Sequence, residues 1–273
     1  VYIDISDIEK EKELCVRLSK NVGSWDWDLL SNFDLEALKN FGFESEELDK
    51  LLDLRPDNEK DDEIPDVPEE PKSKLGEIYQ LGNHRIMCGD ATKKEDVEKL
   101  MDGKKADMVF TDPPYGIGYK DIQGKFDVIK NDISGNSEFY NFLIKALSTW
   151  RAGRGYICCN WISYLTFFRA MMEVGLPPKS CIIWDKEVPI QHLDKFYKQH
   201  EFIIYFGEFG SQKTLDGDVW RIRRETRKDH PTAKPIELCS RAIKYSSKID
   251  NIVLDLFLGS GNTLIACEKL NRI

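Results

Sequence analysis

The hydrophobic positions in the C-terminal three quarters of the chain form short apolar runs that alternate with amphipathic stretches. Short runs rich in β-branched and aromatic side chains are typical of strands, whereas apolar residues three or four positions apart are typical of helices. We expect strands at residues 84–90, 106–112, 155–160, 180–186, 201–208 and 251–257. Helices are expected at residues 94–101, 137–150, 163–175, 236–247 and 262–270.

This alternation of strands and helices predicts an α/β fold with a doubly wound, mostly parallel sheet. In such sheets, ligands bind at the carboxyl ends of the strands. The runs at 180–186 and 201–208 are expected to form a pair of strands, and the second fits the antiparallel strand that such sheets often carry.

The N-terminal quarter of the chain has a different pattern. Residues 55–73 are acidic, contain several prolines and lack apolar periodicity, which is typical of an extended linker. They separate a piece at 1–54 from a body at 74–273. The piece is expected to be small and α-rich, with a short strand at 1–5 and a helix over 33–43. At this size its independent folding is marginal.

The formal charge of the chain is −9, but the charge is unevenly distributed. Residues 44–70 hold thirteen carboxylates against three basic side chains, so the remainder of the chain is close to neutral. Residues 221–234 hold six basic side chains against two acidic ones. Because local charge determines binding partners better than net charge does, a polyanionic partner is compatible with this sequence.

Several function classes are not expected from the composition. No apolar run approaches the roughly 20 residues that a membrane span needs, so no membrane partner is expected. The N-terminus lacks the basic and apolar segments of a signal peptide, and the seven cysteines are scattered without a CxxC pair. This usage is typical of reduced core residues in a cytoplasmic protein. None of the four histidines lies near a cysteine at zinc spacing, so no metal site is expected.

The first candidate site is the sequence Asp112-Pro113-Pro114-Tyr115, which ends the strand at 106–112. Two consecutive prolines fix φ and remove two backbone donors, so the strand cannot continue and its carbonyls are held outward. An Asp carboxylate and a rigid carbonyl then offer two acceptors beside an aromatic ring. This combination suits an exocyclic amino group on a flat base. The simpler alternative is a tight turn with a capping Asp.

The second candidate site is the strand–loop–helix junction at 253–263, which contains Gly259 and Gly261. Small residues let backbone amides approach a ligand at the N-terminus of the following helix. The dinucleotide pattern GxGxxG is not met, because Leu264 occupies the place of the third glycine. Asp255 is positioned to accept a hydrogen bond from a ligand ammonium, and its alternative role is a cap.

Two further polar residues are candidates. Lys234 lies between Pro231 and Pro235, on a rigid loop that suits a ligand carboxylate, although a solvated lysine is the alternative. Asp90 ends the strand at 84–90 and is expected on the same sheet edge as the double-proline corner. Its alternative role is to cap the next helix.

Together, the DPPY, HPTAKP and FLGSGNT motifs, in this order, resemble the β-class amino-methyltransferases that modify DNA bases with S-adenosylmethionine. The resemblance covers 74–273 and implies a circularly permuted, Rossmann-like methyltransferase fold. It implies methyl transfer to the N6 amino group of adenine in double-stranded DNA, because Asp at the head of the tetrapeptide is typical of adenine-N6 members. It also allows a homodimer. The alternatives are a cytosine-N4 enzyme, an enzyme acting on RNA, or a catalytically inactive DNA-binding, partition-type protein.

The resemblance also implies roles for individual residues. Asp112 and Pro113 orient the target amino group, Pro114 completes the rigid corner, and Tyr115 stacks on the extruded base. The cofactor pocket is lined by the residues Phe257, Gly259, Ser260, Gly261, Asn262 and Thr263. Asp255 lies near the methionine end of the cofactor, Asp90 near its adenine, and Thr232 and Lys234 near its carboxylate.

Positioning on DNA is expected to depend on the basic residues before HPTAKP, although a solvated basic loop is the alternative. These candidates for phosphate contact are Arg221, Arg223, Arg224, Arg227 and Lys228. Residues 17–43 resemble the tail of a ParB-like domain that is fused to such methyltransferases in phages and mobile elements. In the family, a further strand follows the helix at 262–270 and carries an acidic residue that binds the cofactor ribose. The sequence reaches Ile273 before that strand, so we expect the methyltransferase domain to be C-terminally incomplete.

Overall fold

A computed structural model describes residues 35–44, 47–48, 73–118, 136–190, 196, 198–208, 217–224 and 233–273. The chain divides into two compact units, Val1–Pro68 and Glu69–Ile273, and the division falls within the stretch expected to be a linker. In the first unit, helix α3 (Leu35–Asn40) lies within the helix predicted over 33–43. The strand predicted at 1–5 lies outside the described residues.

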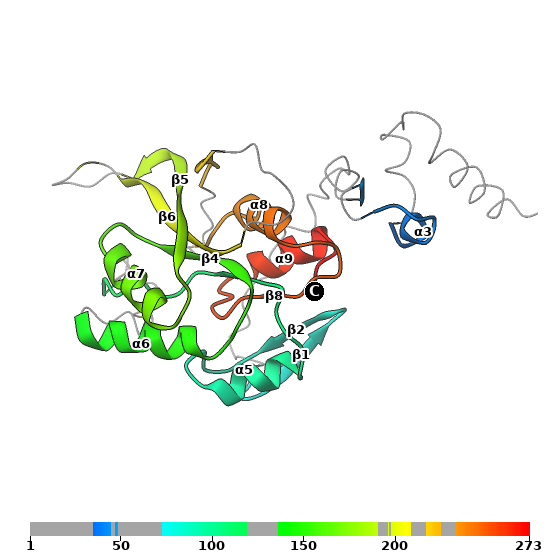
Figure 1. Cartoon of the computed structure of the whole chain (residues 1–273), viewed down its shortest axis with the longest axis horizontal. Helices are drawn as coiled ribbons and strands as arrows, with labels where there is room; N and C mark the ends of the chain where they lie inside the picture. Colours follow the sequence, from blue (N-terminus) through cyan, green and yellow to red (C-terminus); the bar gives the residue numbers. More distant parts are fainter. Residues whose placement is uncertain are drawn as a thin grey trace, which may run out of the picture. The chain divides into compact units, whose positions relative to one another are not determined.

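The second unit contains a six-stranded sheet with the strand order β7-β5-β6-β4-β3-β8 (Figure 1). Its strands are β3 (Met108–Thr111), β4 (Arg154–Cys159), β5 (Pro178–Ile190), β6 (Lys198–Gly207), β7 (Val219–Arg221) and β8 (Val253–Leu254). The helices of this unit are α5 (Lys94–Met101), α6 (Asn136–Ser148), α7 (Tyr164–Glu173), α8 (Ile236–Ser246) and α9 (Asn262–Lys269). The predicted α/β fold is confirmed.

One strand of the described sheet, β6, runs opposite to the others. It pairs antiparallel with both β4 and β5, whereas β3 pairs parallel with β4 and β8, and β5 pairs parallel with β7. The antiparallel strand predicted at 201–208 is therefore confirmed. Because β6 is reversed, its first residues lie at the edge where the other five strands have their carboxyl ends.

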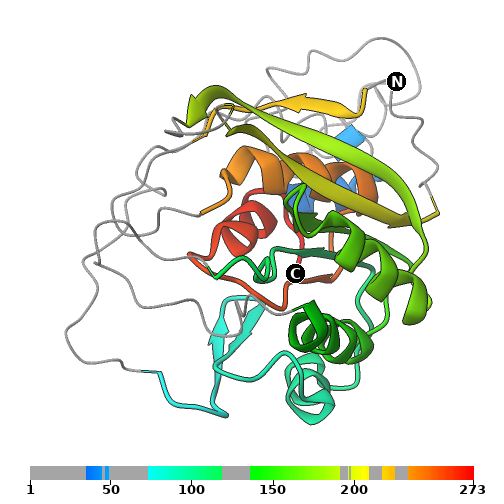
Figure 2. The same cartoon turned by 90° about the vertical axis from the view of Figure 1, so that its left-hand side faces the viewer.

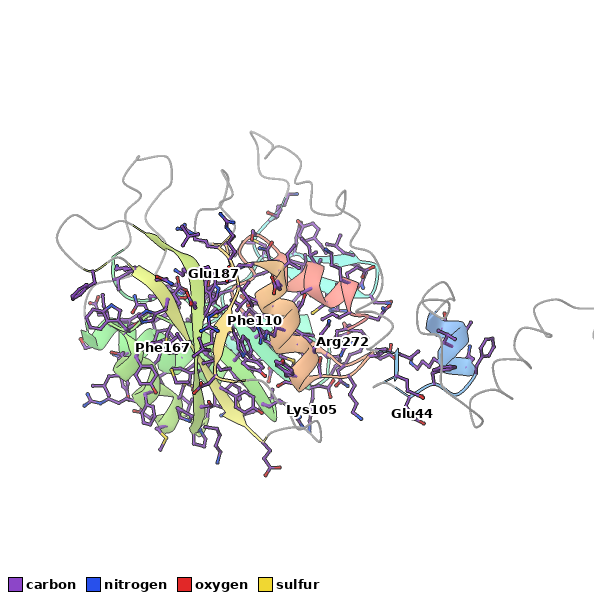
Figure 3. All side chains as sticks on the ribbon, turned by 90° about the horizontal axis from the view of Figure 1, so that it is seen from above. Glu44, Lys105, Phe110, Phe167, Glu187 and Arg272 are labelled. Atoms are coloured by element: carbon purple, nitrogen blue, oxygen red, sulfur yellow. The ribbon has the colours of Figure 1, made fainter. Side chains whose placement is uncertain are left out.

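The sheet is covered on both faces, as a doubly wound fold requires. Phe110 of β3 points to the core that contains residues of α8 and α9, while its neighbour Val109 points to the core that contains residues of α6 and α7. Successive residues of a strand point to opposite faces, which explains this alternation. Figure 2 shows the two helical layers, and Figure 3 shows Phe110 beside α8 and Phe167 on α7.

The predicted strand at 84–90 has a different position from the one expected. Its residues His84–Met87 form β2, which pairs with β1 (Ile78–Leu81) in a separate antiparallel hairpin and not with the central sheet. The expectation that this strand joins the main sheet is therefore wrong. The two strands are joined by a two-residue Gly82-Asn83 loop, where Gly82 has a φ of 57°. A Gly-Asn pair between two strands is a hairpin signal, and it explains why β2 pairs locally.

Strand β8 is shorter than predicted, because the chain leaves the strand conformation at Asp255 to enter the glycine bend. On the side of β8 away from β3, the backbone of Ile273 donates to Asn251 O at 2.9 Å and accepts from Val253 N at 2.8 Å. Within the described part of the chain, no helix combines the length and apolar composition needed to cross a bilayer.

Candidate active site

The double-proline corner lies directly after β3, at the carboxyl edge of the sheet. Pro113 is buried, while Asp112 and Tyr115 are half-buried. The ring of Tyr115 packs edge-on against Phe167 of α7, with 6.4 Å between ring centroids. The corner is therefore held by the core of the domain and still presents polar atoms at the edge of the sheet.

Gly116, the residue after the corner, is required by its surroundings. Its φ is 68°, and a Cβ at this position would lie 2.5 Å from the ring of Phe139 on α6. A positive φ and this close approach both exclude a larger side chain. The chain can therefore pass close to Phe139 as it leaves the corner.

Both oxygens of the Asp112 carboxylate have donors. The Tyr115 hydroxyl donates to Oδ1 at 2.7 Å, and the ammonium of Lys234 lies 2.6 Å from Oδ2. Lys234 is 8% exposed and its Nζ lies 5.4 Å from the centre of the Tyr115 ring. The prediction that Lys234 faces the cofactor carboxylate remains a prediction, but the structure places its ammonium against Asp112.

Two charged residues that the sequence analysis did not identify complete this cluster. Glu201 of β6 lies 3.2 Å from Nζ of Lys234 through Oε2, and it accepts from the Tyr115 hydroxyl at 3.0 Å. Lys186 of β5 lies 2.5 Å from the other oxygen of Glu201. We call these five residues, Asp112, Tyr115, Lys186, Glu201 and Lys234, the charge cluster. The cluster contains two carboxylates and two ammonium groups, so its charges balance.

The charges in the cluster determine its protonation. Burial alone would raise the pKa of Glu201, but Lys234 and Lys186 hold that pKa at about 2. Burial would lower the pKa of Lys234, yet the Asp112 and Glu201 carboxylates raise it above its usual value. Burial and the same two carboxylates raise the pKa of Tyr115 well above 10. At neutral pH the Tyr115 hydroxyl therefore remains protonated, Glu201 remains negatively charged and Lys234 remains positively charged.

The glycine bend lies beside this cluster. Asp255, the first residue after β8, accepts from the Thr111 hydroxyl at 3.0 Å, from the Thr263 hydroxyl at 2.7 Å and from the backbone of Phe257 at 3.0 Å. Burial raises the pKa of Asp255 to about 6, although these three hydrogen bonds oppose the shift. Gly261, with a φ of 85°, allows the turn into α9.

The structure brings the two motifs together, as the sequence predicts. Thr111, which bonds Asp255, is the residue directly before Asp112. The buried side chain of Asn262 donates to the backbone carbonyl of Lys234 at 2.5 Å, which ties the start of α9 to the loop before α8. The corner and the bend therefore lie at one edge of the sheet, joined through side chains of both.

A pocket of about 200 Å³ lies along β8, between the β1–β2 hairpin, α5 and α9. Polar atoms reach it from Asp90, Asp255 and Thr263, and the apolar residues Leu256 and Leu258 line it. Asp90 reaches this pocket from the hairpin and not from the central sheet, and its carboxylate accepts from the backbone and hydroxyl of Thr92. These bonds lie before α5, whose N-cap is Lys93 without a side-chain cap hydrogen bond, so the alternative that Asp90 caps this helix is wrong.

The surroundings of four further residues that were predicted to bind the cofactor are as follows. The ring of Phe257 packs against Phe142 of α6 at 6.0 Å between centroids. Gly259 has a φ of 57° and is exposed, and Ser260 is half-buried. Thr232 lies outside the described residues. The roles assigned to these residues remain predictions.

Three of the predicted phosphate contacts lie at and after the carboxyl end of β7, at the same edge as the charge cluster. Arg221 and Arg223 are exposed, and Arg224 is half-buried. Nε of Arg221 lies 3.8 Å from Asp185 of β5. Arg227 and Lys228 lie outside the described residues.

The known proteins to which this chain is similar are DNA methylases and methyltransferases. A profile of the family described as DNA methylase matches residues 106–228 and 208–273, which is more than half of the chain. The type II methyltransferase M2.MboI of Moraxella bovis is 27% identical over 199 residues, 61% of this chain and 73% of the relative. The DNA adenine methyltransferase YhdJ of Escherichia coli is 27% identical over 233 residues, 68% of this chain and 76% of the relative.

Among solved structures, the M1.HpyAVI–SAM complex is similar in fold. The TM-score is 0.50 at 23% sequence identity, and the match covers 67% of this chain and 87% of that chain. At this level of identity, the similarity concerns the fold alone.

Proposed function

Because the chain belongs to the N6/N4 DNA methylase family, we propose that it transfers a methyl group from S-adenosylmethionine to the N6 amino group of adenine in double-stranded DNA. The observation that carries this proposal is the junction between Asp112 and Asp255. The Thr111 hydroxyl bonds Asp255, and the next residue along the chain is Asp112. Asp112, which can accept a hydrogen bond from an amino group, therefore lies beside Asp255, which can bind a cation.

The pocket residues fit the cofactor. Within the described residues, Asp255 accepts only from neutral donors, so a ligand ammonium would supply the missing positive charge. The apolar side chains of Leu256 and Leu258 in the same pocket suit a flat adenine ring, with Asp90 as a polar contact. When bound, the cofactor supplies an electrophilic methyl group on a sulfonium.

The protein's contribution to this reaction is orientation. The lone pair of an exocyclic amino nitrogen is conjugated into the base, so the nitrogen is a weak nucleophile. We propose that Asp112 and the Pro113 carbonyl accept its two N–H groups and turn its lone pair toward the methyl group. The base must leave the helical stack, at a cost of a few kcal/mol, and Tyr115 would stack on it.

The adenine assignment rests on two supports. One relative, YhdJ, is named a DNA adenine methyltransferase, and the corner begins with Asp112, as in adenine-N6 enzymes. The alternatives are N4 of cytosine and a catalytically inactive DNA-binding protein. We further propose that Arg221 and Arg223 contact phosphates, because both are exposed at the edge that holds the charge cluster.

The test uses unmethylated genomic DNA and S-adenosylmethionine with a labelled methyl group. After reaction with the full-length protein, the DNA is digested to nucleosides and separated by chromatography. We expect the label in N6-methyl-2′-deoxyadenosine. Label in N4-methyl-2′-deoxycytidine would replace the target base but keep the enzyme class. Bound cofactor and bound DNA without any transfer would overturn the proposed activity.

The N-terminal piece is a separate proposal. We propose that residues 1–54 are the tail of a ParB-like domain, supported by the resemblance of residues 17–43 and by the division of the chain at Pro68.

A further inference from the structure

The charge cluster raises a question about how Asp112 can receive a substrate. Its Oδ1 already accepts from Tyr115 at 2.7 Å, and its Oδ2 lies 2.6 Å from the Lys234 ammonium. A carboxylate can accept about four hydrogen bonds, so further sites exist. However, a short ammonium contact neutralises much of the charge that would attract a neutral N–H donor. An arriving amino group therefore competes with two donors that belong to the protein.

A second acceptor for both donors lies within reach. Oε2 of Glu201 is 3.0 Å from the Tyr115 hydroxyl and 3.2 Å from Nζ of Lys234. The tyrosine hydroxyl has one hydrogen and can donate fully to only one carboxylate at a time, whereas the lysine ammonium has three. Either donor can therefore turn from Asp112 to Glu201 without losing its partner.

Glu201 is itself held in place for this role. Lys186 occupies its other oxygen, Oε1, at 2.5 Å, so Oε2 is the oxygen that faces Tyr115 and Lys234. The reversed direction of β6 brings this residue to the carboxyl edge, where Glu201 pairs in register with Trp184 of β5. With its pKa near 2, Glu201 remains ionised, and it is an acceptor throughout the working pH range.

We propose that Glu201 is a positioning residue that takes over Tyr115 and Lys234 when the target amino group binds Asp112. This inference rests on the proposed methyl transfer. Glu201 does not contact the substrate; it acts by releasing the oxygens of Asp112 while every charge in the cluster keeps a partner. Without such a second acceptor, the release of Lys234 from Asp112 would leave a buried ammonium unpaired, which is costly.

The competing explanation is purely structural: Glu201 would only balance the charge of two buried lysines. Two variants separate these explanations. Glu201→Gln removes one negative charge, so that Asp112 is the one carboxylate left beside Lys234 among the described residues. The double variant Glu201→Gln/Lys186→Gln restores the balance of charges but not the charged acceptor. Glu208→Gln, the same chemical change on an exposed residue just after the far end of β6, is the matched control.

The experiment measures the single-turnover rate of methyl transfer to unmethylated genomic DNA at saturating cofactor, together with the cofactor Kd and the Tm. For Glu201→Gln we expect a rate about 30- to 100-fold below wild type, at or below the roughly 10²- to 10³-fold cost of losing a group that contacts the transition state directly, because Glu201 acts through Asp112. We expect a cofactor Kd within about threefold of wild type, since binding at Asp255 does not involve Glu201. The double variant should regain most of the Tm and remain slow. Glu208→Gln should match wild type.

A wild-type rate in Glu201→Gln overturns the inference. So does recovery of the rate together with the Tm in the double variant, since charge balance alone would then explain the residue. If Glu201→Gln does not fold, the charge-balanced double variant decides the question by itself. A wild-type protein that binds cofactor and DNA but transfers no methyl group overturns the proposed function, and this inference with it.

Discussion

Asp112 and Asp255 are both half-buried carboxylates at the same edge of the sheet, but their surroundings differ. Asp112 lies against the ammonium of Lys234 and within a cluster whose charges balance. Asp255 accepts hydrogen bonds from two hydroxyls and one backbone amide, all of them neutral. The two sites are connected through Thr111 and through the bond from Asn262 to Lys234. The two carboxylates therefore lie in one scaffold, but their hydrogen-bonding partners differ in charge.

The difference indicates which kind of ligand each site can hold. The charge cluster around Asp112 is balanced, so it suits a neutral ligand such as an amino group, because the ligand does not have to supply a charge. An unbalanced carboxylate suits a cation, and burial without a cationic partner raises its pKa to about 6. Opposite charges nearby have the reverse effect on Glu201, whose pKa is about 2. The protein thus places a neutral acceptor site next to a cation site.

The largest effect is expected at Asp112. Asp112→Ala should lower the rate of methyl transfer about 10³-fold or more, because the acceptor for the target amino group is lost. The cofactor Kd should remain within about threefold of wild type, since Asp255 is intact. Isothermal titration with S-adenosylmethionine and a single-turnover assay measure the two quantities. Retained transfer would refute the role of this carboxylate.

A smaller effect, on the other site, is expected for Asp255→Asn. We expect cofactor binding to weaken about 10- to 100-fold, the value of one lost charge-assisted hydrogen bond. The same change should raise the stability of the cofactor-free protein at pH 7, by on the order of 2 kcal/mol, because an ionised, unbalanced carboxylate is removed. Thermal unfolding with and without cofactor tests both. A loss of stability without cofactor would show that Asp255 is a structural cap.

The pH dependence should separate the two sites further. The pKa of Asp255 is raised to about 6 from 3.8, so its favourable contribution to folding is complete below pH 3.8 and is lost as the pH rises through 6. Binding of a cation has the opposite sign, since it needs the ionised form. The affinity for S-adenosylmethionine should therefore rise, by up to about tenfold per pH unit, between pH 5 and 6 and level off near pH 7. Asp255→Asn should abolish this rise.

The smallest effect is expected outside both sites. Arg223→Gln should weaken DNA binding only a few-fold and reduce the slope of log K against log salt by about 1, as the loss of one phosphate contact does. The transfer rate at saturating DNA and the cofactor Kd should not change. Fluorescence anisotropy at several salt concentrations measures the slope. An unchanged slope would assign Arg223 to a solvated surface.

The sequence predicted the parts of the site that depend on local pattern. The apolar run ending in Asp112-Pro113 and the glycine bend after Asp255 each mark the end of a strand, and parallel strands end at one edge. This is sufficient to bring the two motifs together. The predicted boundaries of α5 and α8 were also close to those in the structure, because the amphipathic period of both helices is regular.

The charge cluster could not be predicted in this way, because it depends on strand order. Glu201 begins an apolar run that was expected to be antiparallel, but nothing in the run indicates that β6 lies between β4 and β5. Had the antiparallel strand been placed there, Glu201 would have been expected at the carboxyl edge. Lys234 lies outside helices and strands, directly before α8, and its partner among several carboxylates is determined by tertiary structure.

The contact between Gly116 and Phe139 has a consequence for attempts to change base preference. A methyl group at position 116 would collide with the phenyl ring, and the backbone there is in a conformation that side chains disfavour. Libraries that randomise this position would mostly yield misfolded chains. Engineering of the loop that leaves the corner should therefore begin at Ile117 and keep the glycine constant.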